Sequence, residues 1–436
     1  MNLDIVTRFA PSPTGNLNIG GVRAGIFAYL FARHNKGRFI VRIEDTDRER
    51  SKKEFEENIL ESLAWLGIEH DALYRQSAHA ARHEELLRIL VEQEKAYLSR
   101  EAPNEEGGRE EVIRFRNPGT VITFTDAIHG EISFDTAELK DFVIAKSFSE
   151  PLFHFGVVVD DWDEGVTHVI RGEDHISNTP RQILIQEALG APRPHYAHLP
   201  LIMGSDGAKL SKRKGAKAIT EYRGLGYLPE AVLNYDALLG WHPEGEKEIF
   251  SRSELIEAFT LERVQKSPAT FDETKLLWFN REHLKLLSDT EFSKRLRDFS
   301  GVEADARLIP LLRERSQTLK EASDALAAGE YGFLCDSVSF SKELLLKGAK
   351  ADAETVKNNL QKAAQLLKGV ADEAFTAQEA KRAVFDYATG QGRASVLWPL
   401  RVALSGREKS PDPFTLCALL GKEKTLERIA GAVQML

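Results

Sequence analysis

The chain has 436 residues, of which 42% are hydrophobic and 29% charged, and this indicates a globular protein of about two to four domains. Only two cysteines occur, Cys335 and Cys417, which excludes a disulfide scaffold and a multi-cysteine zinc site and favours a reducing, cytoplasmic compartment. The net charge of −9 argues against unselective coating of nucleic acid, although a local basic patch could still bind RNA. No apolar run approaches the roughly 20 residues of a membrane helix, so we expect no membrane partner and no signal peptide.

The first fifty residues predict the opening of a parallel sheet. Leu3–Phe9 is a short apolar strand, and the prolines of Ala10–Gly15 turn it into a loop. Val22–His34 has the apolar rhythm of a helix, and Phe39–Ile43 is a second buried strand followed by the acidic segment Glu44–Asp47. This strand–loop–helix–strand order is typical of an α/β sheet with ligand-binding loops at the strand ends.

Two amphipathic helices are expected next, at Lys53–Leu66 and His79–Glu94. The segment Arg100–Glu111 is rich in Pro, Gly and Glu and is expected to be an exposed loop. Val112–Phe148 contains short β-like runs separated by turn signals. These runs indicate a small α+β module inserted into the parallel-sheet domain.

After the insertion the strand–helix alternation returns. Val166–Ile170 and Leu199–Met203 predict buried strands, with a helix at Asn178–Leu189 between them. From about Ile249 the pattern becomes that of amphipathic helices, and from Glu321 onward the chain is expected to be helical nearly throughout. The sequence therefore predicts a doubly wound α/β domain followed by all-α domains.

Two loops have features that suit a nucleotide. Asn18-Ile19-Gly20-Gly21 precedes a helix, where glycine lets the backbone approach a ligand and the helix N-terminus offers N–H groups to a phosphate. Lys209-Leu210-Ser211-Lys212-Arg213-Lys214 is a dense cationic loop, which suits the charge that grows on a departing pyrophosphate. Taken alone, the first loop also fits an ordinary strand–helix turn and the second a solvated basic loop.

Together, the two loops match one enzyme family. Pro11–Gly21 resembles the first signature of class I aminoacyl-tRNA synthetases, and Lys209-Leu210-Ser211-Lys212-Arg213 resembles their second, lysine-bearing signature. Further matches narrow the resemblance to glutamyl-tRNA synthetases of the bacterial kind and lie at Arg42–Asp47, Val169–His175, Leu239–Trp241, Ser267–Asp272 and Leu400–Gly406. The resemblance covers nearly the whole chain and keeps the family order.

The resemblance implies a set of glutamate-binding residues. Arg8 is expected to pair the γ-carboxylate, since a guanidinium fork matches a planar carboxylate, and Ser12 can add a hydrogen bond. Glu44 is expected to hold the α-ammonium group, and Arg171 to supply a second cation near the substrate. For each of these residues the alternative is an internal salt bridge that supports a loop.

The resemblance also implies an ATP site, with Mg²⁺ on the phosphates. The backbone of Gly20 and Gly21 would face the nucleotide, Asp174 the ribose and His175 the adenine, while Lys209 and Lys212 would stabilise the α-phosphate and pyrophosphate. Because the substrate carboxylate itself attacks the α-phosphate, positioning and charge stabilisation are enough, and we expect no protein nucleophile.

Three positions depart from the family pattern. Asn18 stands where the family usually has a catalytic histidine that donates to the phosphates, and slower activation is therefore expected. Phe153 and Val157 stand where Tyr and Asn commonly line the glutamate pocket; their loss weakens binding unless His154 compensates. The zinc-binding cysteines of many relatives are also missing from the inserted module, so no metal site is expected.

The resulting plan has five segments. We expect a Rossmann-like catalytic domain at 1–96 and 166–243, an acceptor-end-binding module at 97–165, a helical stem-contact domain at 244–315 and a helical anticodon-binding domain at 316–436. The expected activity is ATP-dependent ligation of L-glutamate to tRNA(Glu) by a monomer. The alternatives are a paralogue that charges tRNA(Gln) with glutamate, and a degenerate paralogue that only binds or regulates tRNA.

Overall fold

The computed structural model describes residues 4–100, 111–210, 216–334 and 337–436. The chain divides into two compact units, Met1–Leu286 and Leu287–Leu436. Among the described residues, no helix is both long and apolar enough to cross a membrane.

The first unit is built on a seven-stranded sheet with strand order β3-β2-β1-β10-β11-β6-β7. All neighbouring pairs are parallel except β6 and β7, which form an antiparallel hairpin at one edge. The strands are β1 (Val6–Phe9), β2 (Arg38–Ile43), β3 (Ala72–Arg75), β10 (His168–Gly172), β11 (His195–Leu199), β6 (Val121–Asp126) and β7 (Gly130–Asp135). The chain winds outward from β1 through β2 to β3 and then returns beside β1 with β10, so the order reverses between β1 and β10. In doubly wound sheets, the carboxyl ends of the strands at such a reversal form the ligand-binding crevice.

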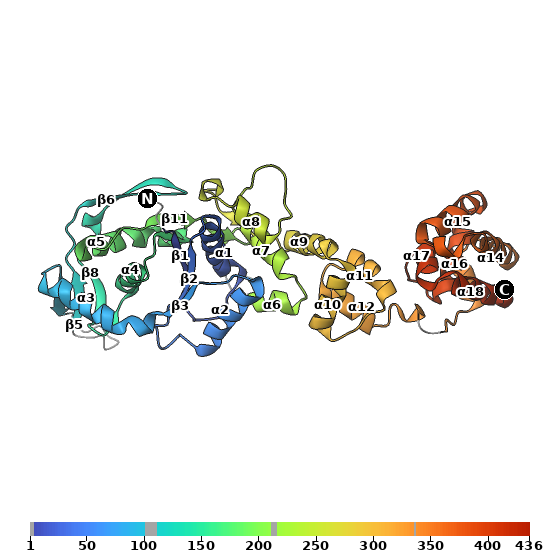
Figure 1. Ribbon diagram of the computed structural model, residues 1–436, viewed down its shortest axis with the longest axis horizontal. Helices are drawn as coiled ribbons and strands as arrows, with labels where there is room; N and C mark the ends of the chain where they lie inside the picture. Colours follow the sequence, from blue (N-terminus) through green and yellow to red (C-terminus); the bar gives the residue numbers. More distant parts are fainter. Residues whose placement is uncertain (1–3, 101–110, 211–215, 335–336) are drawn as a thin grey trace. The chain divides into compact units, whose positions relative to one another are not determined.

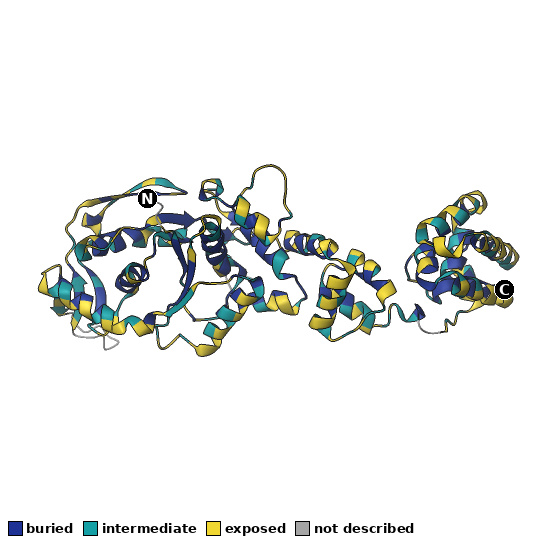
Figure 2. Ribbon diagram, viewed as in Figure 1, coloured by how far each residue is buried: buried dark blue, intermediate teal, exposed yellow. Residues whose placement is uncertain are grey.

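Helices cover both faces of this sheet (Figure 1). On one face, α1, α2, α7 and α8 share a hydrophobic core with Phe9, Phe39 and Val41. On the other face, α3, α4 and α5 pack against Val6, Ile40 and neighbouring strand residues. These helices are α1 (Ile19–His34), α2 (Lys53–Leu66), α3 (Ala80–Glu92), α4 (Phe153–Asp163), α5 (Thr179–Leu189), α7 (Pro229–Leu238) and α8 (Arg252–Ala258). Figure 2 shows the strands buried between the two layers, with exposed residues on the outer sides of the helices.

The alternation of side chains along the strands decides which residues meet α4. Because successive residues of a strand point to opposite faces, Arg8 lies on the same face as Val6, and Arg42 on the same face as Ile40. Arg171 and His198 are likewise on this face and are direct neighbours in the register of β10 and β11. A row of polar side chains thus crosses the sheet beneath α4 and α5.

The inserted segment is divided between two sheets. Four antiparallel strands form a separate sheet of order β4-β5-β8-β9, with bounds Ala96–Arg100, Glu111–Phe115, Phe142–Ser147 and Glu150–Pro151. The β6–β7 hairpin instead extends the main sheet, through the pairing of Asp126 with Tyr196. The sequence patterns predicted β-structure here, but not that two of the strands would complete the sheet of the catalytic domain.

The helical region begins inside the first unit. Phe250, Leu255 and Phe279 are part of the same core as α1, so residues 244–286 pack against the α/β domain within the first unit. The remaining elements of the first unit include α6 (Ile219–Gly224), α9 (Glu273–Leu286), and the parallel pair β12 (Ile202–Met203) and β13 (Ala269–Thr270). Amphipathic periodicity shows that a helix has an apolar face but not which neighbour covers it.

The second unit is helical, as the sequence predicted. Three of its helices pack together, α10 (Asp289–Ser300), α11 (Ile309–Arg315) and α12 (Leu319–Ala327). The others are α13 (Lys342–Lys347), α14 (Ala353–Lys368), α15 (Ala377–Gln391), α16 (Arg393–Ser405), α17 (Pro413–Leu420) and α18 (Lys422–Met435), with α16 in contact with α14, α15, α17 and α18. Burial raises the pKa of the Cys417 thiol to about 12, so this cysteine is a packing residue of α17, whereas Cys335 lies outside the described residues.

Candidate active site

A cavity of about 810 Å³ opens at the carboxyl ends of β1 and β10, where the strand order reverses. Twelve residues that the sequence pointed to line this one cavity: Arg8, Ser12, Asn18, Gly20, Gly21, Glu44, Phe153, Val157, Arg171, Asp174, His175 and Lys209. Lys212 lies outside the described residues, so its place in the site stays a prediction. Asn18 and Lys209 line the same cavity because β1 and β11, which precede them, are parallel strands of one sheet and end at one edge of it.

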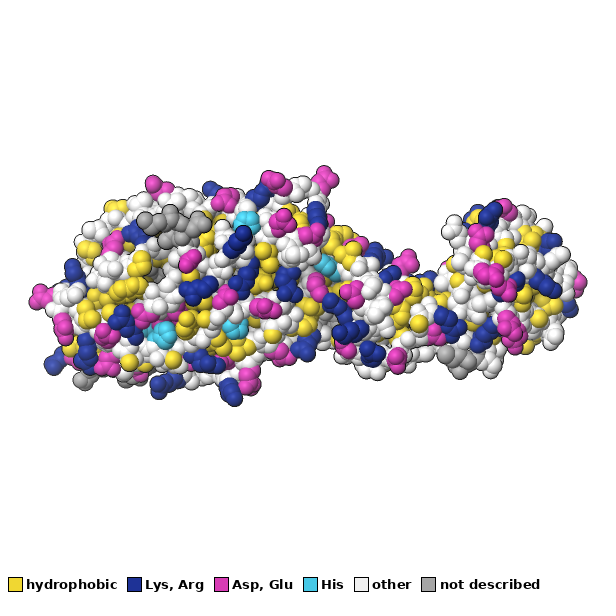
Figure 3. Space-filling model, viewed as in Figure 1, with side chains coloured by type: hydrophobic (Ala, Val, Ile, Leu, Met, Phe, Trp, Pro, Cys, Tyr) yellow, Lys and Arg dark blue, Asp and Glu magenta, His cyan; other side chains and the backbone are white. Residues whose placement is uncertain are grey.

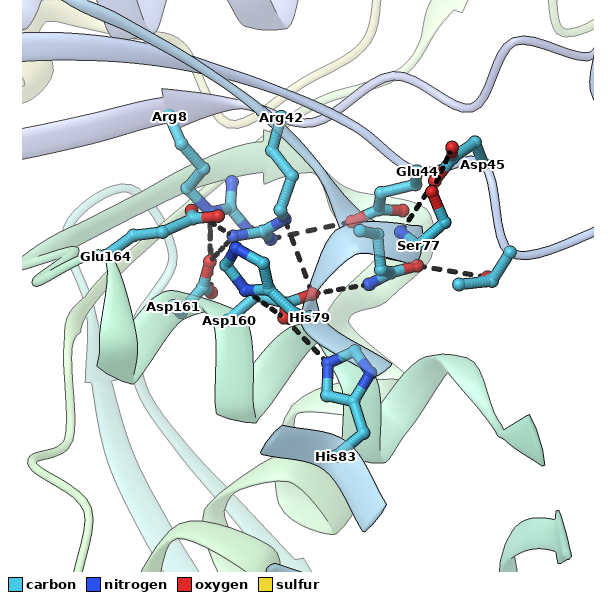
Figure 4. A network of polar contacts seen from close by, with 12 residues as sticks. Arg8, Arg42, Glu44, Asp45, Ser77, His79, His83, Asp160, Asp161 and Glu164 are labelled. Atoms are coloured by element: carbon cyan, nitrogen blue, oxygen red, sulfur yellow. Dashed lines mark hydrogen bonds and ion pairs between the residues drawn. The ribbon is translucent and has the colours of Figure 1, made fainter. Parts of the chain in front are cut away.

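A buried network of charges holds Arg8 (Figure 4). Arg8 Nε lies 3.1 Å from Asp161 Oδ1 on α4, and the same carboxylate oxygen lies 2.8 Å from Arg42 Nη1. Although burial acts to raise it, the pKa of Asp161 is lowered because both guanidinium groups favour the carboxylate. Arg8 is therefore ion-paired inside the protein, and it also lines the cavity, so its pairing with a glutamate carboxylate stays a prediction.

Arg42 is the centre of the network. Its fully buried guanidinium lies 2.6 Å from Glu164 and 3.5 Å from Glu44. Burial acts to lower the pKa of Arg42, but four neighbouring carboxylates outweigh this effect and raise the pKa. Asp160 extends the network to His83 Nε2 at 2.7 Å and to Gln76 Nε2 at 2.7 Å. The 3-10 helix Gln76–His79 and α3 are thereby fixed to α4.

Glu44 is placed to meet a cation. It follows β2 directly, lines the cavity and is 8% exposed. Burial raises its pKa to about 7, with Arg42 and Arg8 acting in the opposite direction. A ligand ammonium group beside it would favour the ionised carboxylate.

Arg171 is a buried cation whose direct partners are neutral. Its Nε donates to His198 Nε2 at 3.1 Å, and its Nη2 donates to Thr179 Oγ1 at 2.8 Å. Within the described residues, no carboxylate lies within 4 Å of its guanidinium, and burial together with the charge of Arg8 lowers its pKa to about 10. Because a buried charge without a counter-ion is costly, this arrangement suits an anionic ligand.

The N-terminus of α1 differs from the sequence-based expectation. Asn18 is the N-cap residue, and its Oδ1 accepts the backbone N–H of Gly21 at 2.8 Å. One of the N–H groups expected to face a phosphate is thus occupied by the protein itself. The carboxamide NH₂ of Asn18 is the part of this side chain that can donate to a ligand.

Elsewhere in the lining, Lys209 Nζ lies 2.8 Å from Asp174 Oδ2. The Asp174 carboxylate folds back over Gly172, where a Cβ atom would lie 2.4 Å from Oδ1, so a side chain at position 172 would displace this carboxylate. The ring of His175 lies 5.4 Å from that of Phe153, and burial, together with Arg171, lowers the pKa of His175 to about 4. The His175 imidazole is therefore neutral near pH 7 and can pack against an aromatic ligand.

Phe153 and Val157 are one turn apart on α4 and both line the cavity. His154 is not in the cavity lining, and burial lowers its pKa to about 4. Successive residues of a helix point about 100° apart, so a residue next to Phe153 cannot share its direction. His154 therefore does not replace the missing polar groups.

The chain matches the catalytic domain of the class I tRNA synthetases (E and Q) over residues 4–107 and 100–278, and an anticodon binding domain over residues 279–433. It is 38% identical to the glutamate–tRNA ligase of Desulforamulus reducens, over 99% of this chain and all of the relative. It is 40% identical to that of Xanthomonas axonopodis pv. citri, over 98% of each chain. The crystal structure of a glutamate tRNA ligase from Elizabethkingia meningosepticum, in complex with its amino acid, is similar with a TM-score of 0.83 and 32% identity over the full length of both chains.

The chain belongs to the glutamate–tRNA ligase family of class I synthetases. The resemblance inferred from the motifs and the predicted fold class are thereby confirmed.

In this member of the ligase family, several residues that shape the site were not predicted from the sequence. Arg23 on α1 lines the cavity and donates to the carbonyl groups of Leu239 and Pro200. Asp161 and Arg42 fix Arg8 from behind the cavity. One signal was available, because the two adjacent carboxylates Asp160 and Asp161 interrupt an apolar segment, and buried carboxylates need buried cations.

Proposed function

We propose that the cavity between β1 and β10 binds L-glutamate and ATP, forms glutamyl-adenylate and transfers the glutamyl group to the 3′ end of a tRNA. The observation that carries this proposal is Arg171, a cavity-lining cation that is 7% exposed and has no carboxylate partner among the described residues. A carboxylate of the substrate would supply the missing counter-ion. The family membership and the curated glutamate–tRNA ligases in it support glutamate as that substrate.

Within this proposal, the two ends of glutamate are recognised by opposite charges. Arg8 pairs the γ-carboxylate through the Nη groups that its bond to Asp161 leaves available, and Arg171 provides the second cation. Glu44 accepts from the α-ammonium group, and Ser12 adds a hydrogen bond from the loop after β1. Phe153 and Val157 contribute only apolar contacts, so binding depends on the charged groups.

ATP occupies the remainder of the cavity. Lys209 binds the phosphates, assisted by Lys212, and Asp174 accepts from the ribose hydroxyls once Lys209 has moved to the nucleotide. His175 packs on the adenine, and Gly20 and Gly21 allow close approach of the backbone. The described lining offers only two carboxylates, Glu44 and Asp174, and this does not fit a dedicated protein cage for Mg²⁺. We expect Mg²⁺ to arrive on the ATP phosphates, where it neutralises their charge.

The chemistry needs positioning rather than a protein nucleophile. An oxygen of the substrate α-carboxylate forms a bond to the α-phosphorus of ATP as the bond to pyrophosphate breaks. In the second step, a hydroxyl of the terminal ribose of tRNA attacks the carbonyl carbon, and AMP leaves. The cations around the cavity stabilise the charge that develops on the departing groups.

Three parts of the chain are proposed to contact tRNA: residues 97–165 the acceptor end, 244–315 the stem and 316–436 the anticodon. Lys and Arg side chains are interspersed with acidic ones on the face shown in Figure 3, which provides contacts for a phosphate backbone despite the net charge of −9. The match of residues 279–433 to an anticodon binding domain supports the last assignment. We further propose that the protein acts as a monomer in the cytoplasm.

ATP–pyrophosphate exchange with glutamate, run with and without tRNA, tests the proposal. Loss of a hydrogen bond to a charged group costs about 1.5–3 kcal/mol, so Arg171→Met should raise the KM for glutamate at least about tenfold. Arg252→Met removes a half-buried arginine of α8 that does not line the cavity and should leave this KM unchanged.

Absence of ATP–pyrophosphate exchange under all conditions would favour a non-catalytic paralogue. Charging of purified tRNA(Glu) and tRNA(Gln) side by side separates the two enzymatic alternatives.

A further inference from the structure

A second set of buried polar side chains lies behind Arg171, separate from the network around Arg42. His198 on β11 is fully buried, and its Nε2 accepts the Nε–H of Arg171 at 3.1 Å. Its Nδ1 lies 2.6 Å from Asp126 Oδ2, at the end of β6. Asp126 is 2% exposed, so three polar residues on three neighbouring strands form one chain that ends at the cavity.

The tautomer of His198 follows from these contacts. A guanidinium group has only donors, so Nε2 of His198 must present a lone pair to Arg171. The ring proton is then on Nδ1, where it is donated to the Asp126 carboxylate. His198 is therefore held as the neutral tautomer that can accept a hydrogen bond from an arginine.

Asp126 is fixed in turn by the backbone. Its Oδ1 accepts the N–H groups of Ile128 and His129, both at 2.9 Å, and its Oδ2 also accepts the backbone N–H of His198 at 3.0 Å. Four donors thus converge on one carboxylate. A carboxamide could not replace it, because in either orientation its NH₂ group would face donors.

The Nε edge of Arg171 is tied to this chain, and one Nη group donates to Thr179. Arg8 is held in the same manner, with its Nε edge on Asp161. Each guanidinium is thus bound at its inner edge by the protein while its residue lines the cavity. Such anchoring fixes the direction of the fork before a substrate arrives, which reduces the entropy lost on binding.

We propose that His198 and Asp126 are positioning residues for glutamate binding: Asp126 fixes the tautomer of His198, and His198 orients the guanidinium of Arg171 toward the substrate carboxylate. This inference rests on the proposed role of Arg171. It assigns a function in amino-acid recognition to β6, a strand of the segment inserted between the two halves of the catalytic domain.

Two substitutions of His198 separate its two contacts. In His198→Gln the side-chain oxygen can take the place of Nε2 and accept from Arg171, whereas in His198→Asn the amide reaches only the position of Nδ1, toward Asp126. We expect the KM for glutamate to rise at least about tenfold in His198→Asn and less than threefold in His198→Gln, with the KM for ATP within twofold of the unchanged protein in both. Asp126→Asn, which disturbs the tautomer, should also raise the KM for glutamate at least about tenfold.

His283→Leu is the matched control, since His283 is a buried, hydrogen-bonded histidine of α9 outside the cavity lining. His283→Leu should lower the melting temperature without changing the KM for glutamate.

Equal effects of His198→Gln and His198→Asn on the KM for glutamate, or a parallel rise in the KM for ATP, would overturn the inference. An Arg171→Met variant with an unchanged KM for glutamate would overturn the proposed role of Arg171 and this inference with it. A raised KM in Arg171→Met alone, with both His198 variants unaffected, would overturn only the positioning role.

Discussion

Lys209 and Asp174 form an ion pair in the wall of the cavity, with Nζ 2.8 Å from Oδ2. The two residues are proposed to bind different parts of ATP, and here they neutralise each other. Both side chains are about half exposed, and such pairs contribute at most about 1 kcal/mol. A nucleotide can therefore replace this contact at little cost, with the phosphates taking Lys209 and the ribose taking Asp174.

Lys209→Ala should affect chemistry rather than folding. We expect the rate of ATP–pyrophosphate exchange at saturating ATP to fall by about 10²–10³, the effect of removing one preorganised group that stabilises transition-state charge. The melting temperature should shift by less than about 2 °C, because the exposed ion pair contributes little to stability. Lys247→Ala provides the control, since Lys247 is similarly exposed and paired with Glu254 but lies outside the cavity. An exchange rate in Lys209→Ala equal to that of the control would refute the assigned role.

Asn18 combines a structural and a proposed catalytic role, and two substitutions separate them. Asn18→Ala removes the N-cap of α1 and should lower the free energy of unfolding by about 0.5–2 kcal/mol. Asn18→His loses the same cap but gains a donor that can carry positive charge toward the phosphates. We expect it to be destabilised while its exchange rate is maintained or raised. Urea unfolding and exchange assays measure the two effects separately, and a fall in exchange with His would show that the loop has been rebuilt around asparagine.

That residues from separate motifs would meet in one site was predictable, because their meeting depends on the topology of the sheet. Arg8 and Arg171 lie near the carboxyl ends of β1 and β10, and Glu44 directly follows β2. Parallel strands end at one edge of the sheet, so these residues had to lie near one another once the alternation of strands and helices was recognised. The direction of each side chain, into the cavity or away from it, was harder to predict from the sequence. Asn18 looked like a phosphate donor, but its oxygen caps α1, and only the backbone geometry of the first helical turn shows this.

The position of β11 was predicted wrongly, and the reason is chemical. The sequence placed a strand at Leu199–Met203, whereas the structure has β11 at His195–Leu199 and a short β12 at Ile202–Met203. The observed strand carries two histidines, His195 and His198, and so lacks a continuous apolar run. His198 is nevertheless fully buried, because Asp126 satisfies its Nδ1 from a strand about 70 residues earlier. A local pattern cannot reveal a partner at that separation.

The pKa of Glu44 predicts a pH dependence of glutamate binding. Burial raises this pKa to about 7, so lowering the pH below 7 protonates the carboxylate that would bind the ammonium group. The value of kcat/KM for glutamate should therefore rise with pH up to about 7 and then level off, since this ratio reports groups of the free enzyme. Glu44→Gln should lower kcat/KM and lack this rise. Glu164→Gln is the control, because burial also raises the pKa of Glu164 to about 7 but Glu164 does not line the cavity. Persistence of the rise in Glu44→Gln would exclude Glu44 as its origin.

The apolar pair on α4 predicts that binding of glutamate can be improved. Phe153→Tyr combined with Val157→Asn restores polar groups on the cavity-facing turn of the helix. Recovery of one hydrogen bond of about 1.4 kcal/mol corresponds to a tenfold lower KM for glutamate. The single variants should each give part of this gain. An increase in KM would indicate that the neighbouring residues have adapted to an apolar wall, and His154→Gln, a change outside the cavity lining, should not alter the KM.

Asp236 on α7 predicts an unusual effect of pH on stability. Both of its carboxylate oxygens are buried without a hydrogen-bond partner in the described part of the chain, and burial raises its pKa to about 8, against an opposing effect of Arg23. Between about pH 4 and pH 8 the native state thus keeps a proton that the unfolded state releases. The free energy of unfolding must then fall as pH rises through this window and level off above it, because stability falls wherever the native state binds more protons.

Asp236→Asn removes this titration while keeping the size of the side chain. Relative to the unchanged protein, the variant should gain stability as pH rises from 5 to 8, by up to about 1.4 kcal/mol per pH unit. Urea unfolding at several pH values, followed by tryptophan fluorescence, reports mainly on the first unit, since four of the five tryptophans lie there. Comparison of the two proteins cancels the contributions of Glu44 and Glu164, which titrate in both. Asp324→Asn, at an exposed position of α12, should show no such pH-dependent difference, and the same flat result for Asp236→Asn would mean that Asp236 is ionised in the native state.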